Sequence, residues 1–284
     1  MGGRGSAFVN YHNANSSSGV DLGILDDIIS SVEEDKDTQL SHKGYTEKLK
    51  ENNIHIKQST DKISDEILVA NAMKINQMTN EYTKTTKMLK KNNEQLRVRA
   101  AKMNDKTEAV FVSSQTNFEH LQVVYNKNMQ YMNKERLEQQ IQNQIDQNFW
   151  TKSDKNELVN HTISHEYGHY IQRVLMERDI RQHKEDKERR QKLINDIKAH
   201  PKNKDKANQL VKKYSEEYAT KYIKSVQRIC RKNFGRDYEQ KILSQYSTEN
   251  NREYFAEIFC NSATNKNPDD LGKAMQIYLN KKLN

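Results

Sequence analysis

Two histidines four residues apart, with a glutamate directly after the first, form the stretch of this chain best suited to chemistry, His165-Glu166-Tyr167-Gly168-His169. An α-helix repeats every 3.6 residues, so positions 165 and 169 lie one above the other on the same face. Both imidazoles can then bind one Zn²⁺ ion at about 2.0–2.1 Å. Glu166 lies beside that face, where it can accept a proton from a water activated by the metal. The spacing is typical of a zinc hydrolase.

The residues around this motif predict that its helix is half buried in a core. Apolar side chains recur at helical spacing on both sides of it, namely Leu158, Val159, Ile163, Ile171, Val174 and Leu175. Gly168 within the helix costs about 1 kcal/mol relative to alanine, which predicts that another backbone or a substrate approaches closely there. His161 adds a third histidine to the row. Because His161 and His169 would be about 12 Å apart along the axis, we interpret His161 as a polar neighbour of the site.

A catalytic zinc needs a third protein ligand and an open fourth position. The segment from Tyr246 to Phe259 offers one, because Glu253 and Glu257 fall at i and i+4 on one helical face. Thr248 or Asn250 can cap the start of that helix. Three bulky residues pack elsewhere on it, Phe255, Ile258 and Phe259. Two carboxylates beside three large apolar side chains are best explained if the carboxylates also face inward, toward a cation.

Together these two segments resemble the zincin metallopeptidases related to anthrax lethal factor. Their pattern is His-Glu-x-x-His, followed downstream by Tyr, six residues and Glu-[Phe/Tyr]-Phe-Ala-Glu-x-Phe, and both halves are present. The resemblance implies His165, His169 and Glu253 as zinc ligands and Glu166 as general base. It also implies that the hydroxyl of Tyr246 steadies the oxyanion or the leaving amine.

The resemblance further implies that Glu257 lies in the outer shell and accepts a hydrogen bond from the free ring nitrogen of a ligand histidine. It is specific at the two motifs and looser from about Leu96 to the C-terminus. It implies an α+β domain with a small mixed sheet above the motif helix. In that fold the edge strand of the sheet holds a peptide substrate in extended form. The chain departs from the family in the charged segment of 83 residues that separates His169 from Glu253.

Local patterns predict the elements that surround the motifs. Residues 44–94 are polar with apolar residues near helical spacing, which predicts one or two helices. Short apolar runs predict three strands, Gln95 to Met103, Ala109 to Ser113 and His120 to Tyr125. Substrate contacts are expected within Val110 to Tyr131. A helix is expected from Asn133 to Gln147, and Trp150 after it is interpreted as a core anchor.

The region between the two metal-binding segments carries the positive charge of the chain. Residues 181–245 hold 19 lysines and arginines against 9 aspartates and glutamates, and the whole chain has a net charge of +8. The signs alternate, as in Lys184 to Arg189, which favours solvent-exposed helices stabilised by i,i+4 pairs. Pro201 is expected to break this insertion into two helices. An acidic protein or substrate partner and nucleic acid are the alternatives, and we favour neither over a solvated insertion.

The first 43 residues differ in composition and predict a flexible arm. Residues 1–20 are rich in Gly, Ser and Asn, and a short apolar helix is expected from Leu22 to Val32. The opening six residues, Met1 to Ser6, resemble the start of many phage-encoded head-associated proteins. We therefore divide the chain into an arm (1–43), a helical region (44–94) and a zincin-like domain (95–284) with the insertion 181–245.

Composition excludes some classes of protein. No run of eighteen apolar residues exists, so no membrane span is expected, and the N-terminus lacks the pattern of a secretory signal. The expected location is therefore the cytoplasm of a bacterial host or a phage particle. Cys230 and Cys260 are expected to be two free thiols, although one disulfide bridge is an alternative.

The sequence thus predicts an α+β zinc endopeptidase that acts on an extended protein or peptide substrate. Two alternatives stay open: a non-catalytic phage structural or interaction protein with the same fold, and a nucleic-acid-binding protein that uses the basic insertion. Glu166 distinguishes the first alternative, because a structural zinc site has no need of a carboxylate beside an open position and favours four protein ligands. A strongly salt-dependent DNA complex would mark the second.

Overall fold

The chain forms a mostly helical α+β structure with one small mixed sheet. A computed structural model describes residues 43–56, 63–103, 108–113, 121–127, 132–200, 203–235 and 243–284. Residues 1–42 of the expected flexible arm lie outside these residues, and so does the short helix expected within it. Pro201, which was expected to break the insertion, also lies outside them. In chain order the elements are α2 (Lys43–Glu51), β1 (Ile54–Ile56), α3 (Asp65–Glu81), α4 (Lys84–Asn92), β2 (Leu96–Ala101), β3 (Ala109–Val112), β4 (Gln122–Asn126), α5 (Lys134–Asp146), η3 (Lys155–Asn160), α6 (His161–Gln182), α7 (Lys184–Lys198), α8 (Lys204–Phe234), η4 (Tyr246–Thr248), α9 (Asn251–Thr264) and α10 (Asp270–Leu283).

The three predicted strands and the predicted helix before Trp150 are confirmed. The strands are β2, β3 and β4, and the helix is α5, whose N-cap Asn133 accepts a hydrogen bond from the backbone N–H of Arg136. In the described part of region 44–94 there are three helices, α2, α3 and α4, where one or two were expected. It also holds β1, a strand of three residues that is too short for a period-2 pattern to reveal.

The sheet has the strand order β1-β2-β4-β3, with β1, β2 and β4 parallel and β3 antiparallel to β4. β3 therefore forms one edge and β4 lies inside, paired on both sides. The expected range of substrate contacts, Val110 to Tyr131, includes both strands. Within the described part of that range, only β3 has an open side where another extended chain could pair.

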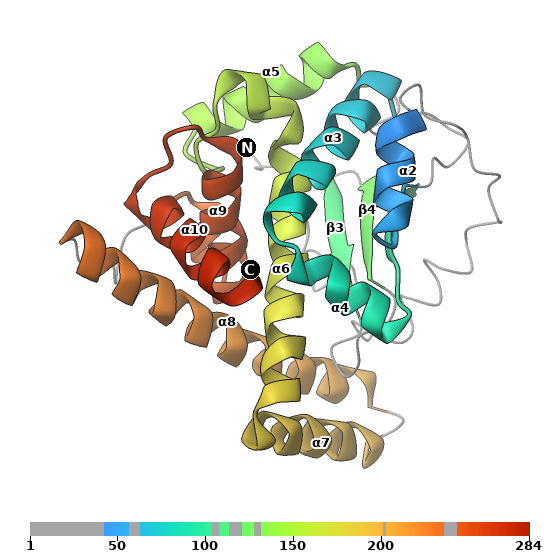
Figure 1. The fold of residues 1–284 in the computed structure, drawn as a ribbon, viewed down its shortest axis with the longest axis vertical. Helices are drawn as coiled ribbons and strands as arrows, with labels where there is room; N and C mark the ends of the chain where they lie inside the picture. The colour runs from blue at the N-terminus through green and yellow to red at the C-terminus, as the bar shows by residue number, and fades with distance from the viewer. Residues whose placement is uncertain are drawn as a thin grey trace.

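Helix α6 runs through the middle of the molecule, with α9 and α10 on one side and the sheet with α2, α3 and α4 on the other (Figure 1). Almost every residue of α6 is buried, including most of its charged and polar ones. A helix buried on all faces cannot show the single apolar stripe of a surface helix. Its polar side chains must therefore find partners inside the protein.

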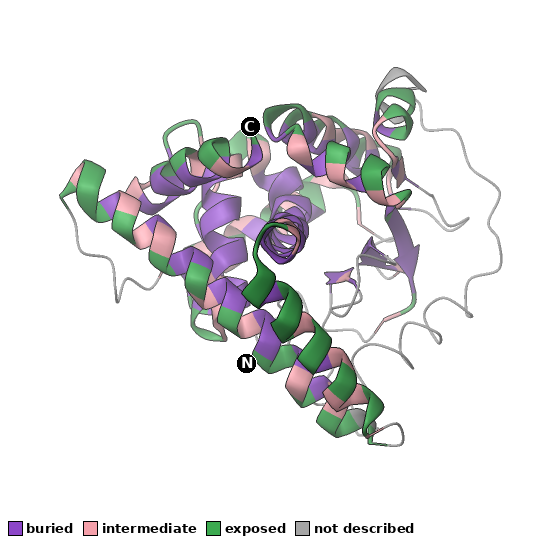
Figure 2. Cartoon of the chain, turned by 60° about the horizontal axis from the view of Figure 1, so that its bottom comes forward, coloured by how far each residue is buried: buried purple, intermediate pink, exposed green. Residues whose placement is uncertain are grey.

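The described residues of the charged insertion form two helices, as predicted: α7 ends at Lys198 and α8 begins at Lys204. Exposed residues follow one side of α7 and α8 (Figure 2), which agrees with the expectation of solvated charged faces. α8 also packs against α9 and α10 and buries three tyrosines, Tyr214, Tyr218 and Tyr222. The insertion thus forms part of the core that supports α9.

Two further expectations concern the cysteines and the membrane. Cys230 and Cys260 are both buried free thiols, so the bridged alternative is not found. Across the described ranges, no helix combines the length and apolar character that crossing a membrane requires.

Candidate metal centre

The two motif histidines lie one turn apart on α6 and point the same way. Their ring centroids are 5.0 Å apart, and both residues are buried. Nε2 of His165 lies 3.0 Å from Oε2 of Glu253, and Nε2 of His169 lies 3.2 Å from the same oxygen. The structure therefore brings together the three residues that the sequence singled out as metal ligands.

Glu253 is placed by the first turn of α9. The side chain of Asn250 caps this helix and accepts hydrogen bonds from the backbone N–H groups of Arg252 and Glu253, at 3.0 and 3.2 Å. Of the two caps considered, Asn250 is the one the structure uses. Glu253 and Glu257 are both fully buried, and this confirms that the acidic face of α9 points inward.

Gly168 allows α6 and α9 to approach closely. A Cβ atom at this position would lie 3.1 Å from Cα of Ala256 and 3.2 Å from Cβ of Phe259. Such distances are tighter than ordinary van der Waals contact, and one of the two atoms is backbone. The expectation of a close backbone approach at Gly168 is confirmed, and the approach lets Glu253 reach the histidines.

Glu257 holds His165 from the side opposite Glu253. Its Oε1 lies 2.9 Å from Nδ1 of His165, and its Oε2 accepts hydrogen bonds from the backbone N–H of Thr151 at 2.8 Å and from the hydroxyl of Ser244 at 2.6 Å. With three partners the carboxylate is well fixed. Nδ1 of His165 then donates its proton to Glu257, which leaves Nε2 as the ligand atom.

Electrostatics keep Glu253 ionised. Burial on its own would raise the pKa of Glu253, but His169 and His165 outweigh burial and hold that pKa well below its usual range. Burial on its own would lower the pKa of His165, but the hydrogen bonds to Glu253 and Glu257 raise it to about 10. The cluster is thus built to attract positive charge, which protons or a metal ion can supply.

The triad could hold a metal ion. One ligand atom from each of His165, His169 and Glu253 lies within 4.8 Å of the other two, and all three residues are buried. Oε1 of Glu253 is buried and has no hydrogen-bond partner among the described residues. A cation bound in the triad would satisfy this oxygen. Two imidazole nitrogens and a carboxylate oxygen suit a divalent transition metal. Elsewhere in the described ranges no other group of His, Cys, Asp and Glu meets the same distance criterion.

Glu166 is buried next to the triad without being part of it. Its carboxylate accepts a hydrogen bond from the backbone N–H of Phe111 in the edge strand β3, whereas its Oε2 has no partner within the described part of the chain. Burial raises the pKa of Glu166, against the opposing effect of His165 and His169. A carboxylate with a raised pKa and a free oxygen is suited to accept a proton.

Aromatic residues form one wall of the centre. The ring centroid of His165 lies 5.6 Å from that of Tyr246 in η4 and 5.2 Å from that of Trp150. Trp150 is also 4.7 Å from Tyr246 and is buried, so it is the core anchor that was expected. Its contact with a ligand histidine was not predicted, because the pairing depends on how the segment after α5 folds back over α6.

His161 takes no part in the triad, in line with its interpretation as a polar neighbour. It is fully buried, its Nδ1 lies 2.7 Å from the hydroxyl of Ser153, and Sγ of Cys260 lies 3.5 Å from the same nitrogen. Burial lowers the pKa of His161 to about 4, so this imidazole is neutral at physiological pH. Cys260 is packed against it, as expected of a buried thiol.

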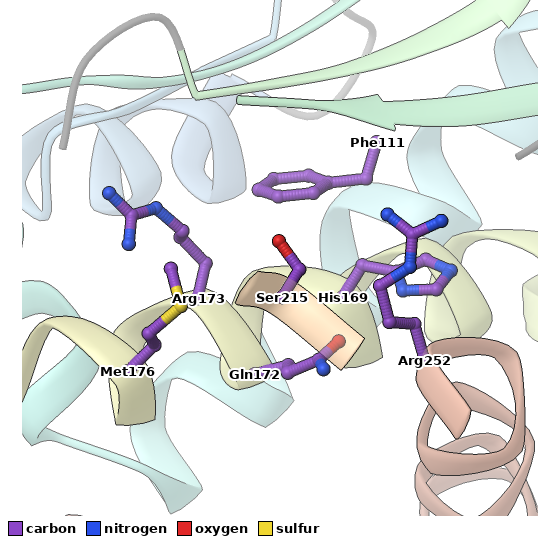
Figure 3. A pocket seen from close by; sticks show the side chains of 7 residues that line it. All are labelled: Phe111, His169, Gln172, Arg173, Met176, Ser215 and Arg252. Carbon is purple, nitrogen blue, oxygen red and sulfur yellow. The ribbon is translucent and has the colours of Figure 1, made fainter. Parts of the chain in front are cut away.

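A small pocket opens beside His169, with a volume of about 20 Å³. Seven side chains line it (Figure 3): Phe111, His169, Gln172, Arg173, Met176, Ser215 and Arg252. The sequence reasoning missed both arginines. The available signal was position, because Arg173 follows His169 by one helical turn and Arg252 directly precedes Glu253.

Comparison of the chain with models of known protein families, with curated proteins and with solved structures found no match. The interpretation of the site therefore depends on its own geometry.

Proposed function

We propose that the chain is a zinc-dependent endopeptidase with a zincin-like catalytic domain. The observation that carries the proposal is the position of Glu166, a buried carboxylate with a free oxygen beside three converging ligand atoms. A site that only held two helices together would not need this residue. Burying an extra carboxylate is costly, and its presence is explained if it transfers protons during catalysis.

Zinc is the metal that this donor set favours. His₂Glu sites with three protein ligands are typical of catalytic zinc, whereas structural zinc sites are closed by four ligands and often contain cysteine. His165, His169 and Glu253 make up the three, and Cys260 lies against His161. When bound, zinc would supply Lewis acidity, which lowers the pKa of a water molecule and polarises a carbonyl group.

Side chains of the protein would then carry out the other parts of catalysis, namely proton transfer, stabilisation of the oxyanion and positioning of His165. Glu166, held by the N–H of Phe111, removes the proton from the attacking water and passes it to the leaving amine. Tyr246 donates a hydrogen bond to the oxyanion of the tetrahedral intermediate or to the leaving amine. Glu257 keeps His165 in one tautomer and orientation.

The edge of the sheet is a place where an extended substrate could bind. β3 is an edge strand that lies next to α6, and its Phe111 contacts both Glu166 and the pocket. A peptide that pairs with the open side of β3 would pass over the metal centre. This arrangement agrees with the zincin-like fold that the two sequence motifs imply.

The nucleic-acid alternative is less well supported, because many cations of the insertion pair with acids. Arg190 binds Glu177, Arg189 binds Glu217, and Nζ of Lys221 lies 2.9 Å from Asp179. Binding to a phosphate backbone needs cations that are free to contact the phosphates and displace the counterions condensed on the nucleic acid. These pairs instead connect α6, α7 and α8.

The test combines metal content with peptide hydrolysis. Protein without a histidine tag is analysed by inductively coupled plasma mass spectrometry, and a library of capped peptides is incubated with it and searched for new termini. We expect about one zinc per chain in the wild type. Glu166→Gln should keep the zinc and lose about 10²–10⁴ in turnover, and Tyr246→Phe should keep it and lose about 10²–10³.

Glu185→Gln is the matched control, because Glu185 is an exposed glutamate on α7. It should leave zinc and turnover unchanged. Absence of zinc from the wild type would refute the metal assignment. Zinc with no cleavage of any peptide, or a Glu166→Gln protein as active as the wild type, would refute the catalytic one.

A further inference from the structure

The end of α5 reverses the chain and places Trp150 beside the metal centre. α5 lies near the N-terminal end of α6 (Figure 1), in contact with η3. Asn148 follows α5 in the left-handed conformation, with φ 56°. The backbone N–H of Phe149 donates to the carbonyl oxygen of Gln144 at 2.8 Å, and the N–H of Asn148 donates to that of Ile145 at 2.8 Å. These two bonds form the Schellman motif that commonly ends a helix. The reversal carries Trp150 back to Gln144, in the last turn of α5.

The segment that follows α5 contacts three groups of the proposed site. Its backbone accepts a hydrogen bond from the N–H of Tyr246 at 3.1 Å. The N–H of Thr151 donates to Oε2 of Glu257. Between these two attachments, the ring of Trp150 packs against the rings of Tyr246 and His165. The position of this segment therefore affects a proposed ligand, the carboxylate that orients it and the proposed hydrogen-bond donor.

Gln144 fixes the ring of Trp150. The indole N–H of Trp150 donates to Oε1 of Gln144, and Nε2 of Gln144 donates to Oε1 of Glu108 at 3.4 Å. Glu108, directly before β3, also accepts a hydrogen bond from Nε2 of Gln140. An indole N–H can only donate, so the amide oxygen of Gln144 must face Trp150 and its NH₂ group must face Glu108. Glu108 therefore holds the amide in the orientation that the tryptophan requires.

The carboxyl group of Glu108 is costly where it lies. The residue is buried, and burial raises its pKa to about 7. Stability alone would favour an uncharged side chain at this position. A buried carboxyl group that accepts hydrogen bonds from two glutamines is explained if the orientation of Gln144 matters to the site. Through Glu108, the start of the edge strand β3 is joined to the aromatic wall of the metal centre.

We infer that Gln144 is a positioning residue of the metal centre and acts through Trp150. Glu108 assists by orienting the amide of Gln144. Packing of Trp150 restricts the ring of His165, and it also restricts the ring of Tyr246. The effect on turnover rests on the proposed peptidase function, whereas the effect on metal binding does not.

The first measurement uses the only tryptophan of the chain. In ¹⁵N-labelled, zinc-loaded protein, Trp150 gives one indole N–H resonance, which reports on its hydrogen bond directly. Gln144→Leu should move this resonance upfield and make the indole proton exchange with water about tenfold faster, because the acceptor is lost. Gln140→Leu is the matched control, since Gln140 lies one turn earlier on α5 and donates to the same oxygen of Glu108. It should leave the resonance in place.

The second measurement compares zinc affinity and turnover in the same proteins. Gln144→Leu should weaken zinc binding about tenfold, measured by competition with a chelator, because the ring of His165 is less restricted. It should also lower kcat about tenfold with little change in KM, since the edge strand that would hold the substrate is unaltered. Gln140→Leu should match the wild type in all three quantities. Urea unfolding of both variants shows whether a difference in stability accounts for the result.

Two substitutions at Glu108 keep the inference testable if Gln144→Leu does not fold. Glu108→Gln keeps an oxygen that can accept the amide N–H of Gln144, so the indole resonance, zinc affinity and kcat should stay close to those of the wild type. Glu108→Leu removes this oxygen and should change all three in the same direction as Gln144→Leu. A residue that only filled space would not separate Glu108→Gln from Glu108→Leu in zinc affinity or turnover.

The positioning role and the peptidase function fail in different ways. A tenfold loss of zinc affinity in Gln144→Leu, with no cleavage of any peptide by the wild type, would remove the peptidase function and leave the positioning role. Cleavage by the wild type, with zinc affinity and kcat of Gln144→Leu equal to those of Gln140→Leu, would overturn the positioning role and leave the peptidase. An indole resonance that ignores Gln144→Leu would overturn it as well.

Discussion

Charged residues are buried where α6 crosses α9 and exposed along α7, although the two regions use the same residue types. Glu253 and Glu257 are fully buried, whereas the side chains of Lys184 and Glu188 are 88% and 64% exposed. An exposed i,i+4 pair adds a few tenths of a kcal/mol and costs little to form. Burying a carboxylate costs several kcal/mol unless it is paired. The crossing thus retains charges that stability alone would not select, and the proposed metal ion would account for them.

The largest effect is expected when one glutamate is removed from each region. Glu253→Ala should abolish zinc binding, and it should lower the free energy of unfolding of the metal-free protein by roughly 3–5 kcal/mol, because the buried imidazoles lose their partner. Glu188→Ala should change neither zinc content nor stability by more than about 0.5 kcal/mol. Zinc stoichiometry and urea unfolding measure both. Equal behaviour of the two variants would mean that the crossing is not a metal centre.

A second buried carboxylate tests what burial costs away from the triad. Glu108 accepts hydrogen bonds from Gln140 and from Gln144, and burial raises its pKa from 4.5 to about 7. Below about pH 4.5 it is protonated in both states. As the pH rises toward 7 the unfolded chain ionises first, so Glu108 destabilises the protein progressively, by about 3 kcal/mol at most.

Glu108→Gln removes this titration. We expect the variant to gain stability relative to the wild type as the pH rises from about 4.5 to 7, and to keep that gain above pH 7. Urea unfolding at a series of pH values gives the difference. Glu185→Gln, an exposed change, should run parallel to the wild type. A constant difference between Glu108→Gln and the wild type at all pH values would contradict the shifted pKa.

Two glycines distinguish close packing from backbone conformation. Gly168→Ala should cost about 1–3 kcal/mol and weaken zinc binding, because the new Cβ meets Ala256 and Phe259 and pushes α9 away. Alanine favours a helix by about 1 kcal/mol, so any net loss reports on packing. Gly235, at the end of α8, has φ +65° and open space around it.

Gly235→Ala is therefore the control, with an expected loss of about 1 kcal/mol from the left-handed conformation and no change in zinc affinity. Zinc affinity is measured by competition with a chelator. If Gly168→Ala bound zinc as tightly as Gly235→Ala, the close crossing would not be what positions Glu253.

The sequence predicted the parts of the site that local spacing determines. His165 and His169 follow from the helical repeat, the inward face of Glu253 and Glu257 from their i,i+4 spacing, and Gly168 from its cost in a helix. Tertiary contacts were out of reach. Trp150 against His165, and Ser244 and Thr151 on Glu257, join segments whose relative position no short pattern encodes.

The insertion also shows that local patterns in the sequence do not predict tertiary contacts. Its alternating charges correctly indicated exposed faces on α7, but the tyrosines on α8 were not recognised as core residues, since they are spread among lysines and glutamates. β1 was missed because three residues are too few to show a period. The two pocket arginines were overlooked because a charged residue beside the metal-binding motif is expected to be exposed to solvent. Only the structure shows that they are buried.

The smallest expected effect lies within the insertion itself. The hydroxyl of Tyr218 donates to Oδ1 of Asp186 at 2.7 Å and joins α8 to α7, with both residues buried. Tyr218→Phe removes one hydrogen bond to a charged group, while Lys221 and Arg189 stay close to Asp186. We expect a loss of about 1–2 kcal/mol and unchanged zinc affinity.

Lys184→Ala, which removes an exposed pair, should cost less than about 0.5 kcal/mol. Urea unfolding of the two variants compares one buried contact with one surface pair in the same region. A larger loss for Tyr218→Phe would show that α7 is attached to α8 by few buried polar contacts, whatever the number of charges on its surface. If both variants lost the same stability, a surface pair in the insertion would contribute as much as the buried contact. Buried polar contacts would then not be what distinguishes the crossing of α6 and α9 from the insertion.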